Sequence, residues 1–183
     1  MAEEYWDTFD EARQPTGRTV QRGADLAAGD LHVVIHVCLF NADGEMLIQR
    51  RADDKRGWPG MWDFSTGGSV TRGESSWQGA EREVFEELGV RLDLSGVRPS
   101  FTFNFHRGFD DFYLIDHEVD ISDLAIPNAE VAEARWAGRD EVLELLGAGL
   151  FIPYRRSAIE FVFDFRGQYD IFDRDALTPE MLP

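Results

Sequence analysis

The chain has 183 residues, of which 43% are hydrophobic and 29% charged, and its formal net charge is −17 at pH 7. This is the composition of a globular domain with its own core. No apolar run approaches the roughly 18 residues that span a bilayer. The negative charge argues against nucleic acid or an anionic membrane as a stable partner. The acidic N-terminus shows no secretory signal, and the only cysteine, Cys38, excludes an internal disulfide, so we expect a cytoplasmic protein with an inert core thiol.

The predicted elements begin with a polar hairpin over residues 4–22, with its turn at residues 14–17. The run 31–40 is nearly continuously apolar and β-branched, which is typical of a strand buried on both faces. The turn signal at residues 41–44 then predicts a returning strand over 45–51, so that the two strands form a hairpin.

Strands and helices continue on both sides of a central helix. Residues 52–61 are predicted to form a loop. The other expected strands cover residues 62–66, 68–71, 97–106, 109–120 and 131–137, the expected helices cover 76–88, 140–146 and 154–163, and 177–183 form a loose tail. Asp140 is expected to cap the second helix. This order predicts an α/β fold with a mixed sheet flanked by helices. We divide one domain into an N-terminal hairpin extension (1–30), a core (31–146) and a C-terminal helix and tail (147–183).

The helix expected over residues 76–88 carries clear start and stop signals. Ser75 can cap the first turn, and Gln78 completes a capping box. Gly89 follows the helix, where a left-handed C-cap is favourable. An apolar stripe that can pack inward consists of Trp77, Ala80, Val84 and Leu88.

Three carboxylates share the neighbouring face of this helix. Glu83, Glu86 and Glu87 are three or four residues apart and lie within an arc of about 100°. A divalent cation relieves their repulsion, and Mg²⁺ or Mn²⁺ prefers such oxygen ligands. Arg82 cannot be a ligand; we expect it to pair with Glu74, which ties the preceding loop to the helix.

The spacing around these glutamates is more informative than the glutamates alone. A glutamate-rich segment is usually a solvated helix face. From Gly68 to Val90, however, the sequence follows the pattern Gly-x5-Glu-x7-Arg-Glu-U-x-Glu-Glu-x-Gly-U, in which U is bulky and aliphatic. The Gly67-Gly68 pair allows the backbone to approach a metal or a phosphate closely. The full pattern favours a catalytic metal site.

With this pattern the sequence resembles the Nudix hydrolase superfamily, over residues 31–146. The resemblance implies an α/β/α sandwich with a mixed central sheet, and hydrolysis of a small-molecule diphosphate joined to a group X with Mg²⁺ or Mn²⁺. It implies metal ligands at Glu83, Glu86 and Glu87, a backbone ligand near Gly68, and an orienting pair of Glu74 and Arg82. A homodimer is left open. The general base is also left open among Glu86, Glu87, Glu118, Glu130 and Glu133.

A narrower resemblance, over residues 31–65, is to the branch that includes isopentenyl-diphosphate isomerases. Arg51 and Lys55 match the cations of that branch that contact the diphosphate. The isomerase needs a cysteine and a metal-binding histidine in the segment that is Phe64–Ser69 here, and neither is present. His32 matches an isomerase metal ligand in position, but without its partners we expect a satisfied strand histidine. Hydrolysis is therefore preferred over isomerisation.

The group X is less well defined. Aromatic side chains that can stack on a planar ring are Trp58, Trp62, Phe101, Phe103, Phe105 and His106. From these, Trp58 and Phe103 are taken as substrate-binding candidates, and a nucleoside diphosphate or a related nucleotide derivative is the preferred substrate. The alternation at 101, 103 and 105 is also typical of a core-facing strand, and we favour that interpretation of these three residues. A non-catalytic nucleotide-binding module is a further alternative, against which the intact glutamates count.

Overall fold

A computed structural model describes residues 3–168 of the chain. The strands are β1 (Tyr5–Phe9), β2 (Pro15–Gln21), β3 (His32–Phe40), β4 (Met46–Arg51), β5 (Trp62–Asp63), β6 (Thr66–Ser69), β7 (Phe101–Phe105), β8 (Gly108–Asp116) and β9 (Val131–Ala137). The helices are α1 (Ser76–Leu88), α2 (Arg139–Gly147) and α3 (Arg156–Asp164), with a 3₁₀ turn at Ile121–Asp123. None of the helices in this part of the chain is long and apolar enough to cross a bilayer.

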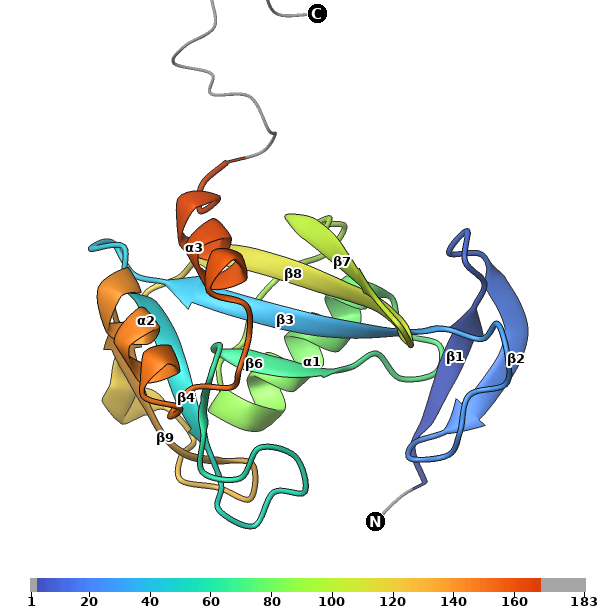
Figure 1. Ribbon diagram of the computed structural model, residues 1–183, viewed down its shortest axis with the longest axis horizontal. Coiled ribbons are helices and arrows are strands. Elements are labelled where there is room, and N and C mark those ends of the chain that lie inside the picture. The colour runs from blue at the N-terminus through green and yellow to red at the C-terminus, as the bar shows by residue number, and fades with distance from the viewer. Residues whose placement is uncertain (1–2, 169–183) are drawn as a thin grey trace, which may run out of the picture.

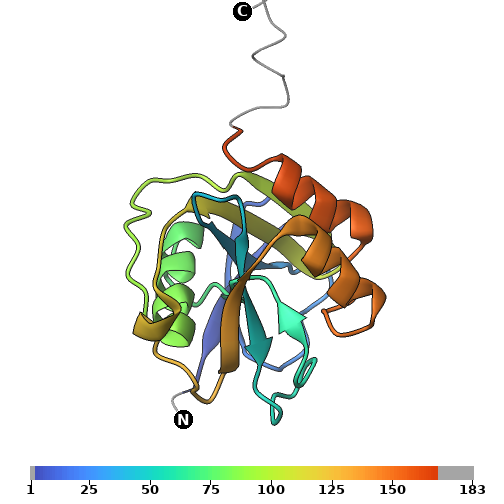
Figure 2. The same cartoon turned by 90° about the vertical axis from the view of Figure 1, so that its left-hand side faces the viewer.

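A mixed sheet forms the middle layer of the fold (Figure 1). Its strand order is β5-β4-β3-β8-β7, while β6 pairs with β3 and β9 pairs with β4. Strands β3 and β8 run parallel, and the other pairs are antiparallel. Helix α1 covers one face, and α2 and α3 cover the other (Figure 2). The predicted α/β/α sandwich is confirmed.

Strand β3 supplies both cores, because successive side chains point to opposite faces. Ile35 and Val37 pack in the cluster that contains Val84 of α1. Cys38 and Phe40 pack in the cluster that includes residues of α3. The predictions that this strand is buried on both faces and that Cys38 is a core thiol are confirmed.

The sequence signals at the ends of α1 are also confirmed. Ser75 and Gln78 form a complete capping box, and Gly89 adopts a left-handed conformation with φ 77°. The helix begins and ends at the predicted residues. Its acidic face is therefore fixed in rotation by caps at both ends and by the buried apolar stripe.

The predicted hairpin of β3 and β4 is wrong beyond its turn. The two strands share a single register pair, Phe40 with Met46. Further along, the Ser65 hydroxyl lies between the strands, accepting a hydrogen bond from the Leu39 amide (2.8 Å) and donating one to the Leu47 carbonyl (2.5 Å). The strands diverge around this side chain, and β6 pairs with β3 where β4 was expected.

The first hairpin turn also differs from the prediction. It lies at residues 10–14, because the Asp10 carboxylate accepts hydrogen bonds from the Ala12 and Gln14 amides, and Pro15 already begins β2. The hairpin forms its own two-stranded sheet at one end of the molecule (Figure 1). It is joined to the loop before α1 by a hydrogen bond from the Gly73 amide to Asp7.

Other element boundaries shift by a few residues. Strand β7 begins at Phe101, so residues 97–100 are not part of it, and β8 ends at Asp116. Strands β5 and β6 replace the expected strands 62–66 and 68–71. Gly138 is the N-cap of α2, and Asp140 lies in its first turn, so the predicted Asp140 cap is wrong. Helix α3 begins two residues after Tyr154. The predicted loose tail, 177–183, lies outside the described residues.

Candidate active site

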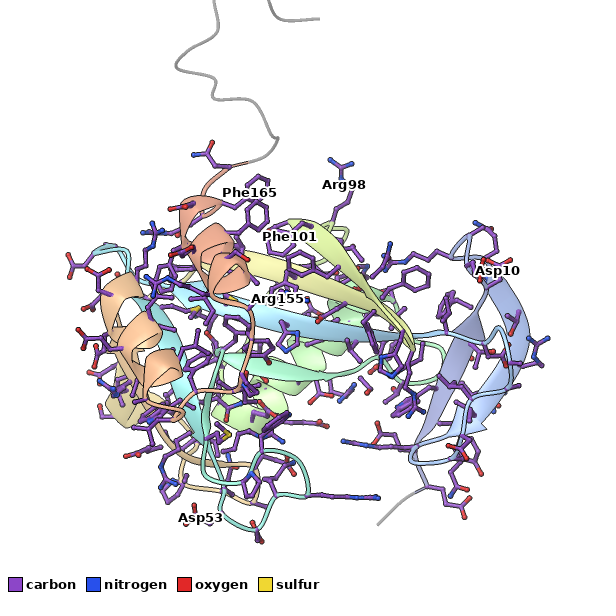
Figure 3. The ribbon with its side chains drawn as sticks, in the orientation of Figure 1. Asp10, Asp53, Arg98, Phe101, Arg155 and Phe165 are labelled. Atoms are coloured by element: carbon purple, nitrogen blue, oxygen red, sulfur yellow. The ribbon has the colours of Figure 1, made fainter. Side chains whose placement is uncertain are left out.

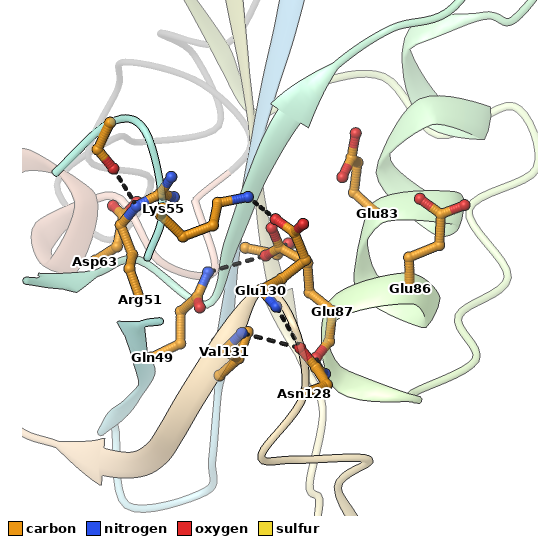
Figure 4. A network of polar contacts seen from close by, with 12 residues as sticks. Gln49, Arg51, Lys55, Asp63, Glu83, Glu86, Glu87, Asn128, Glu130 and Val131 are labelled. Atoms are coloured by element: carbon orange, nitrogen blue, oxygen red, sulfur yellow. Dashed lines mark hydrogen bonds and ion pairs between the residues drawn. The ribbon is translucent and has the colours of Figure 1, made fainter. Parts of the chain in front are cut away.

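The three glutamates of α1 differ in their exposure to solvent (Figure 4). Glu83 is 9% exposed and Glu87 is 4% exposed, whereas Glu86 lies on the open side of the helix. Burial raises the pKa of Glu83 and raises that of Glu87 to about 7. Two desolvated carboxylates therefore lie one helical turn apart, an arrangement that is unfavourable without a compensating cation.

Arg82 provides part of that compensation. Its guanidinium donates to Glu74 (2.8 and 3.1 Å), to Glu83 (2.9 Å) and to Glu86 (3.0 Å). A further hydrogen bond reaches the Ser69 carbonyl at the end of β6 (2.9 Å). Burial alone would lower the pKa of Arg82, but these acidic partners raise it overall. The predicted contact between Glu74 and Arg82 is present, and it joins the loop, the helix and β6.

Glu87 is held by neutral donors instead. Gln49 on β4 donates its amide N–H to the Glu87 carboxylate (2.9 Å), and the Thr66 hydroxyl donates to the same oxygen. Gln49 comes from β4, and Thr66 comes from β6, which pairs with β3 where β4 has diverged from it. The sequence analysis did not identify either residue, because nothing in the local pattern indicates that they meet the helix.

The two glycines of β6, Gly67 and Gly68, lie against side chains on opposite faces of the sheet. A Cβ atom at Gly68 would overlap the Glu83 carboxylate, and one at Gly67 would lie 2.9 Å from the His36 ring on the opposite face. Both positions therefore require glycine for the observed packing. The Glu83 carboxylate therefore lies against Gly68 on the α1 face, and the His36 ring lies against Gly67 on the opposite face.

The end of β4 and the loop that follows it bring cations to the carboxylates (Figure 4). Arg51 donates to the Gly57 carbonyl (2.9 Å) and lies 3.7 Å from the Asp63 carboxylate. Lys55, the only lysine in the sequence, forms an ion pair with Glu130. Its pKa is lowered by burial and by the charge of Arg51, while Glu87 and Glu83 oppose that shift. Arg51 and Lys55 thus lie beside the buried glutamates.

Asn128 places Glu130 at this edge of the site. Its side-chain amide donates to the Glu87 carbonyl (2.8 Å) and accepts from the Glu130 and Val131 amides (2.8 and 2.9 Å). The turn before β9 is thereby attached to the C-terminal end of α1. Glu130 is one of the general-base candidates from the sequence. The sequence does not distinguish it from the others, because this attachment links residues about forty positions apart.

A buried polar chain leads to Arg51 from the other side. The Tyr154 hydroxyl donates to Asp63 (2.9 Å) and lies 3.1 Å from the His36 ring, which in turn bonds to Asp110 (2.8 Å). Burial raises the pKa of Asp63 and of Tyr154. Tyr154, just before α3, therefore helps to fix the Asp63 carboxylate that faces Arg51. None of these four residues was predicted from the sequence.

The two aromatic candidates lie apart from each other. Trp58 is 51% exposed and lies in the same loop as Lys55, with a positive φ of 52°. Phe103 packs with Phe101, Phe112 and Phe161, in the aromatic group between β7 and α3 that also includes Phe165 (Figure 3). That group lies on the face of the sheet opposite α1, so the structure does not bring Phe103 to the glutamates.

His32 differs from the expectation of a satisfied strand histidine. The side chain is buried, but its Nδ1 atom has no hydrogen-bond partner in the described part of the chain. Its ring stacks on Trp6 of β1 with 4.4 Å between ring centroids. The N-terminal hairpin, whose role the sequence left undefined, thus reaches β3.

The family model described as NUDIX domain matches residues 30–156, well over half of the chain. The chain belongs to the Nudix family. It is 52% identical to a Nudix hydrolase of Listeria monocytogenes over 82% of this chain and 89% of that protein. It is also 31% identical to an isopentenyl-diphosphate Delta-isomerase of Salmonella arizonae over 81% of this chain and 84% of that protein.

Comparison of structures agrees with the sequence match. The crystal structure of DR0079 from Deinococcus radiodurans superposes with a TM-score of 0.69 and 22% identity, over 87% of this chain and 97% of that one. The likeness extends to the fold of the whole described core. This likeness shows the mixed α/β fold, while the family model and the Listeria relative show that the protein is a Nudix hydrolase.

The residues at the site suit a hard divalent cation by their chemistry. Glu83 and Glu87 present desolvated oxygen donors, and the buried Oε1 atom of Gln49 has no partner within residues 3–168. In that same range, no three His, Cys, Asp or Glu side chains already converge as a metal cluster. The carboxylates instead accept hydrogen bonds, Glu83 from Arg82, and Glu87 from Gln49 and Thr66. The donor set fits Mg²⁺ or Mn²⁺, with local rearrangement of side chains on binding.

Burial of Glu87 predicts a pH-dependent stability in metal-free buffer. The pKa of Glu87 rises on folding from 4.5 to about 7, so the stabilisation is complete below pH 4.5 and is lost as the pH rises through 7. Glu87→Gln should therefore be more stable than the wild type at pH 8, by up to about 3 kcal/mol. The difference should shrink toward pH 5. Urea unfolding in EDTA at both pH values measures it.

Glu86→Gln, on the open side of the same helix, is the matched control and should keep the pH dependence of the wild type. If Glu87→Gln and the wild type lost the same free energy of unfolding between pH 5 and pH 8, the burial of a charged Glu87 would not be the cause.

Proposed function

We propose that the protein hydrolyses the diphosphate linkage of a nucleoside diphosphate or a related X-linked diphosphate, in a reaction that depends on Mg²⁺ or Mn²⁺. The metal ligands in this proposal are Glu83, Glu86 and Glu87, with the backbone carbonyl near Gly68. The observation that carries it is the pair of buried carboxylates, Glu83 and Glu87, beside two cations, Arg51 at the end of β4 and Lys55 in the loop that follows.

The positive charges of Arg51 and Lys55 support a binding site for a substrate anion. The chain carries a net charge of −17, so a diphosphate is attracted only where positive charge is concentrated. Arg51 and Lys55 supply such a place, and each is held by an acidic partner, Asp63 or Glu130. A diphosphate can replace those contacts with charge-assisted hydrogen bonds.

The reaction in this proposal is an in-line attack of water on one phosphorus atom. When bound, a Mg²⁺ or Mn²⁺ ion would acidify the attacking water and offset charge on the phosphate oxygens. Arg51 and Lys55 orient the diphosphate. Arg82 and Glu74 keep the preceding loop in a fixed position relative to the helix that carries the three glutamates.

Two of the acidic candidates for the general base are favoured by their location. Glu87 and Glu130 both lie at the edge of the site that contains Lys55. Glu118 instead accepts a hydrogen bond from Ala42, at the turn after β3, and Glu133 pairs with Arg50. We therefore assign the general base to Glu87 or Glu130.

The isomerase alternative has a relative in its favour but lacks its reactive groups. In the segment Phe64–Ser69, Ser65 bridges the two strands and Thr66 holds Glu87. The glycine pair follows, with no thiol or imidazole in the segment. These occupied positions support hydrolysis over isomerisation.

Removal of a carboxylate tests the proposed metal dependence. Glu87→Gln should lower metal-dependent phosphate release by about a hundredfold or more, because a ligand charge is lost at the reacting centre. Wild-type turnover should vanish in EDTA and return with Mg²⁺ or Mn²⁺. Phosphate release is measured over nucleoside diphosphates, nucleotide sugars, dinucleoside polyphosphates, and prenyl and thiamine diphosphates.

The control for this variant is Glu144→Gln, an exposed glutamate on α2, which should keep wild-type turnover. Undiminished turnover in Glu87→Gln would refute the assignment. Release from none of the substrates would favour a binding module, and rearrangement of isopentenyl diphosphate without release would favour an isomerase.

Adjacent arginines on β4 test the substrate contact. Arg51→Ala should raise KM by about ten- to a hundredfold, because a charge-assisted hydrogen bond contributes about 1.5–3 kcal/mol. Arg50→Ala is the matched control, since Arg50 pairs with Glu133 and Asp53 and should leave KM within about twofold. Steady-state kinetics on the same substrate compare the two. Equal effects of both substitutions would show that overall charge, and not the position of Arg51, matters.

A further inference from the structure

Strand β5 brings a second acidic group, Asp63, to the cations of the site. Asp63 is 4% exposed, and its Cα partner on β4 is Gln49, the residue that donates to Glu87. Arg51 follows Gln49 by two residues on β4, and its guanidinium lies 3.7 Å from the Asp63 carboxylate (Figure 4). The pairing of two strands therefore connects the buried Glu87 with the cation that we assign to the diphosphate.

The two carboxylate oxygens of Asp63 have different partners. The Oδ1 atom accepts hydrogen bonds from the Tyr154 hydroxyl (2.9 Å) and from the Phe64 amide (2.8 Å). The Oδ2 atom is the one that faces Arg51. Because the carboxylate cannot rotate without breaking a bond at Oδ1, Oδ2 stays directed toward the guanidinium.

Arg51 is held in place while most of its N–H groups stay available. Within residues 3–168, its side chain makes one hydrogen bond, from Nε to the Gly57 carbonyl. The 3.7 Å separation from Asp63 is longer than a hydrogen bond, so this carboxylate attracts the guanidinium by charge without occupying its donors. A long side chain that is restrained before binding loses less entropy when a ligand binds. Arg51 is therefore prepared for an anion.

Tyr154 is held in turn by a buried histidine. Its hydroxyl proton goes to Asp63, so its oxygen accepts from the His36 Nε2 atom (3.1 Å), and the His36 Nδ1 atom donates to Asp110 (2.8 Å). His36 thus donates from both ring nitrogens. Burial opposes the resulting charge, but Asp110, and then Asp63, raise the pKa of His36 overall. Every member of this polar chain has a partner, which makes the chain rigid.

The Tyr154 hydroxyl also favours the charged form of Asp63. Burial raises the pKa of Asp63, whereas the charge of His36, the bonds from Tyr154 and Phe64 and the charge of Arg51 oppose that shift. A neutral Asp63 would attract the guanidinium far less. The Tyr154 ring is fixed separately, because it stacks on Phe64 with 4.7 Å between ring centroids. The hydroxyl can therefore be removed while the ring stays in place.

We propose that Tyr154 and Asp63 are positioning residues, which act through Arg51 and hold its guanidinium ready for the diphosphate. The proposal rests on the proposed diphosphate hydrolysis, in which Arg51 binds the substrate. Tyr154 packs with the core cluster of α2 and α3, on the face of the sheet opposite α1. The residues that determine substrate affinity thus extend through the sheet to the segment before α3.

A diphosphate probe that is not hydrolysed tests this positioning. The probe is methylenediphosphonate, and calorimetry with Mg²⁺ measures its affinity. Tyr154→Phe should weaken binding by about three- to tenfold, because a hydrogen bond to a charged group is lost. Asp63→Asn keeps the Oδ1 acceptor but loses the charge that faces Arg51, and it should weaken binding at least as much. Tighter binding by Asp63→Asn would show that Asp63 competes with the diphosphate for Arg51, and would overturn the proposal.

A double-mutant cycle tests whether Tyr154 acts through Arg51. Tyr154→Phe should cause no further loss of affinity in the Arg51→Ala background, because the guanidinium that it positions is absent. Equal losses in both backgrounds would overturn the proposal. Tyr113→Phe is the matched control, since Tyr113 is also buried and its hydroxyl donates to Ser76. It should leave the affinity within about twofold of the wild type, because it shares no partner with Arg51.

Phosphate release separates this proposal from the one on which it rests. Tyr154→Phe should raise KM by the factor seen with the probe and leave kcat within about twofold, because the glutamates keep their contacts. Phosphate release with an unchanged KM and unchanged probe affinity in Tyr154→Phe would overturn the positioning role and leave the hydrolase proposal standing. Weaker probe binding by Tyr154→Phe, without phosphate release from any substrate, would support the positioning role and overturn the hydrolase proposal.

Discussion

The contacts of Arg82 hold the acidic face of α1 together. One guanidinium bonds to three carboxylates, those of Glu74, Glu83 and Glu86, and to the carbonyl at the end of β6. The loop, the helix and the strand are thereby fixed around a single cation. Because one positive charge meets three negative charges, and the buried Glu87 lies outside its contacts, the site keeps an excess of negative charge. That excess favours a further cation at this position.

Two groups of residues near the glutamates lie on opposite faces of the sheet. On the α1 face, Arg51 at the end of β4 and Lys55 in the following loop bring positive charge to the carboxylates. On the other face, Trp6 and His32 form an aromatic wall that the N-terminal hairpin completes. Between them, the Glu83 carboxylate lies against Gly68 and the His36 ring lies against Gly67.

The sequence alone predicts those structural features that depend on residues close together in the chain. The capped helix α1 follows from Ser75, Gln78 and Gly89, and the buried strand β3 follows from its apolar run. The separation of β3 from β4 does not, because it depends on the Ser65 hydroxyl between strands distant in sequence. The same limit applies to Gln49, which holds Glu87 from 38 residues away. Local periodicity carries no signal for such long-range contacts. The stacking of Trp6 on His32 is another contact of this kind.

The central claim is that the fold holds these carboxylates together for a divalent cation. Titration of Mn²⁺, followed by the electron paramagnetic resonance signal of the free ion, tests it most directly. The wild type should bind Mn²⁺ saturably at pH 7.5, and Glu83→Gln should weaken that binding by about tenfold or more. Equal Mn²⁺ binding by Glu83→Gln and the wild type, or no binding by the wild type, would contradict the claim.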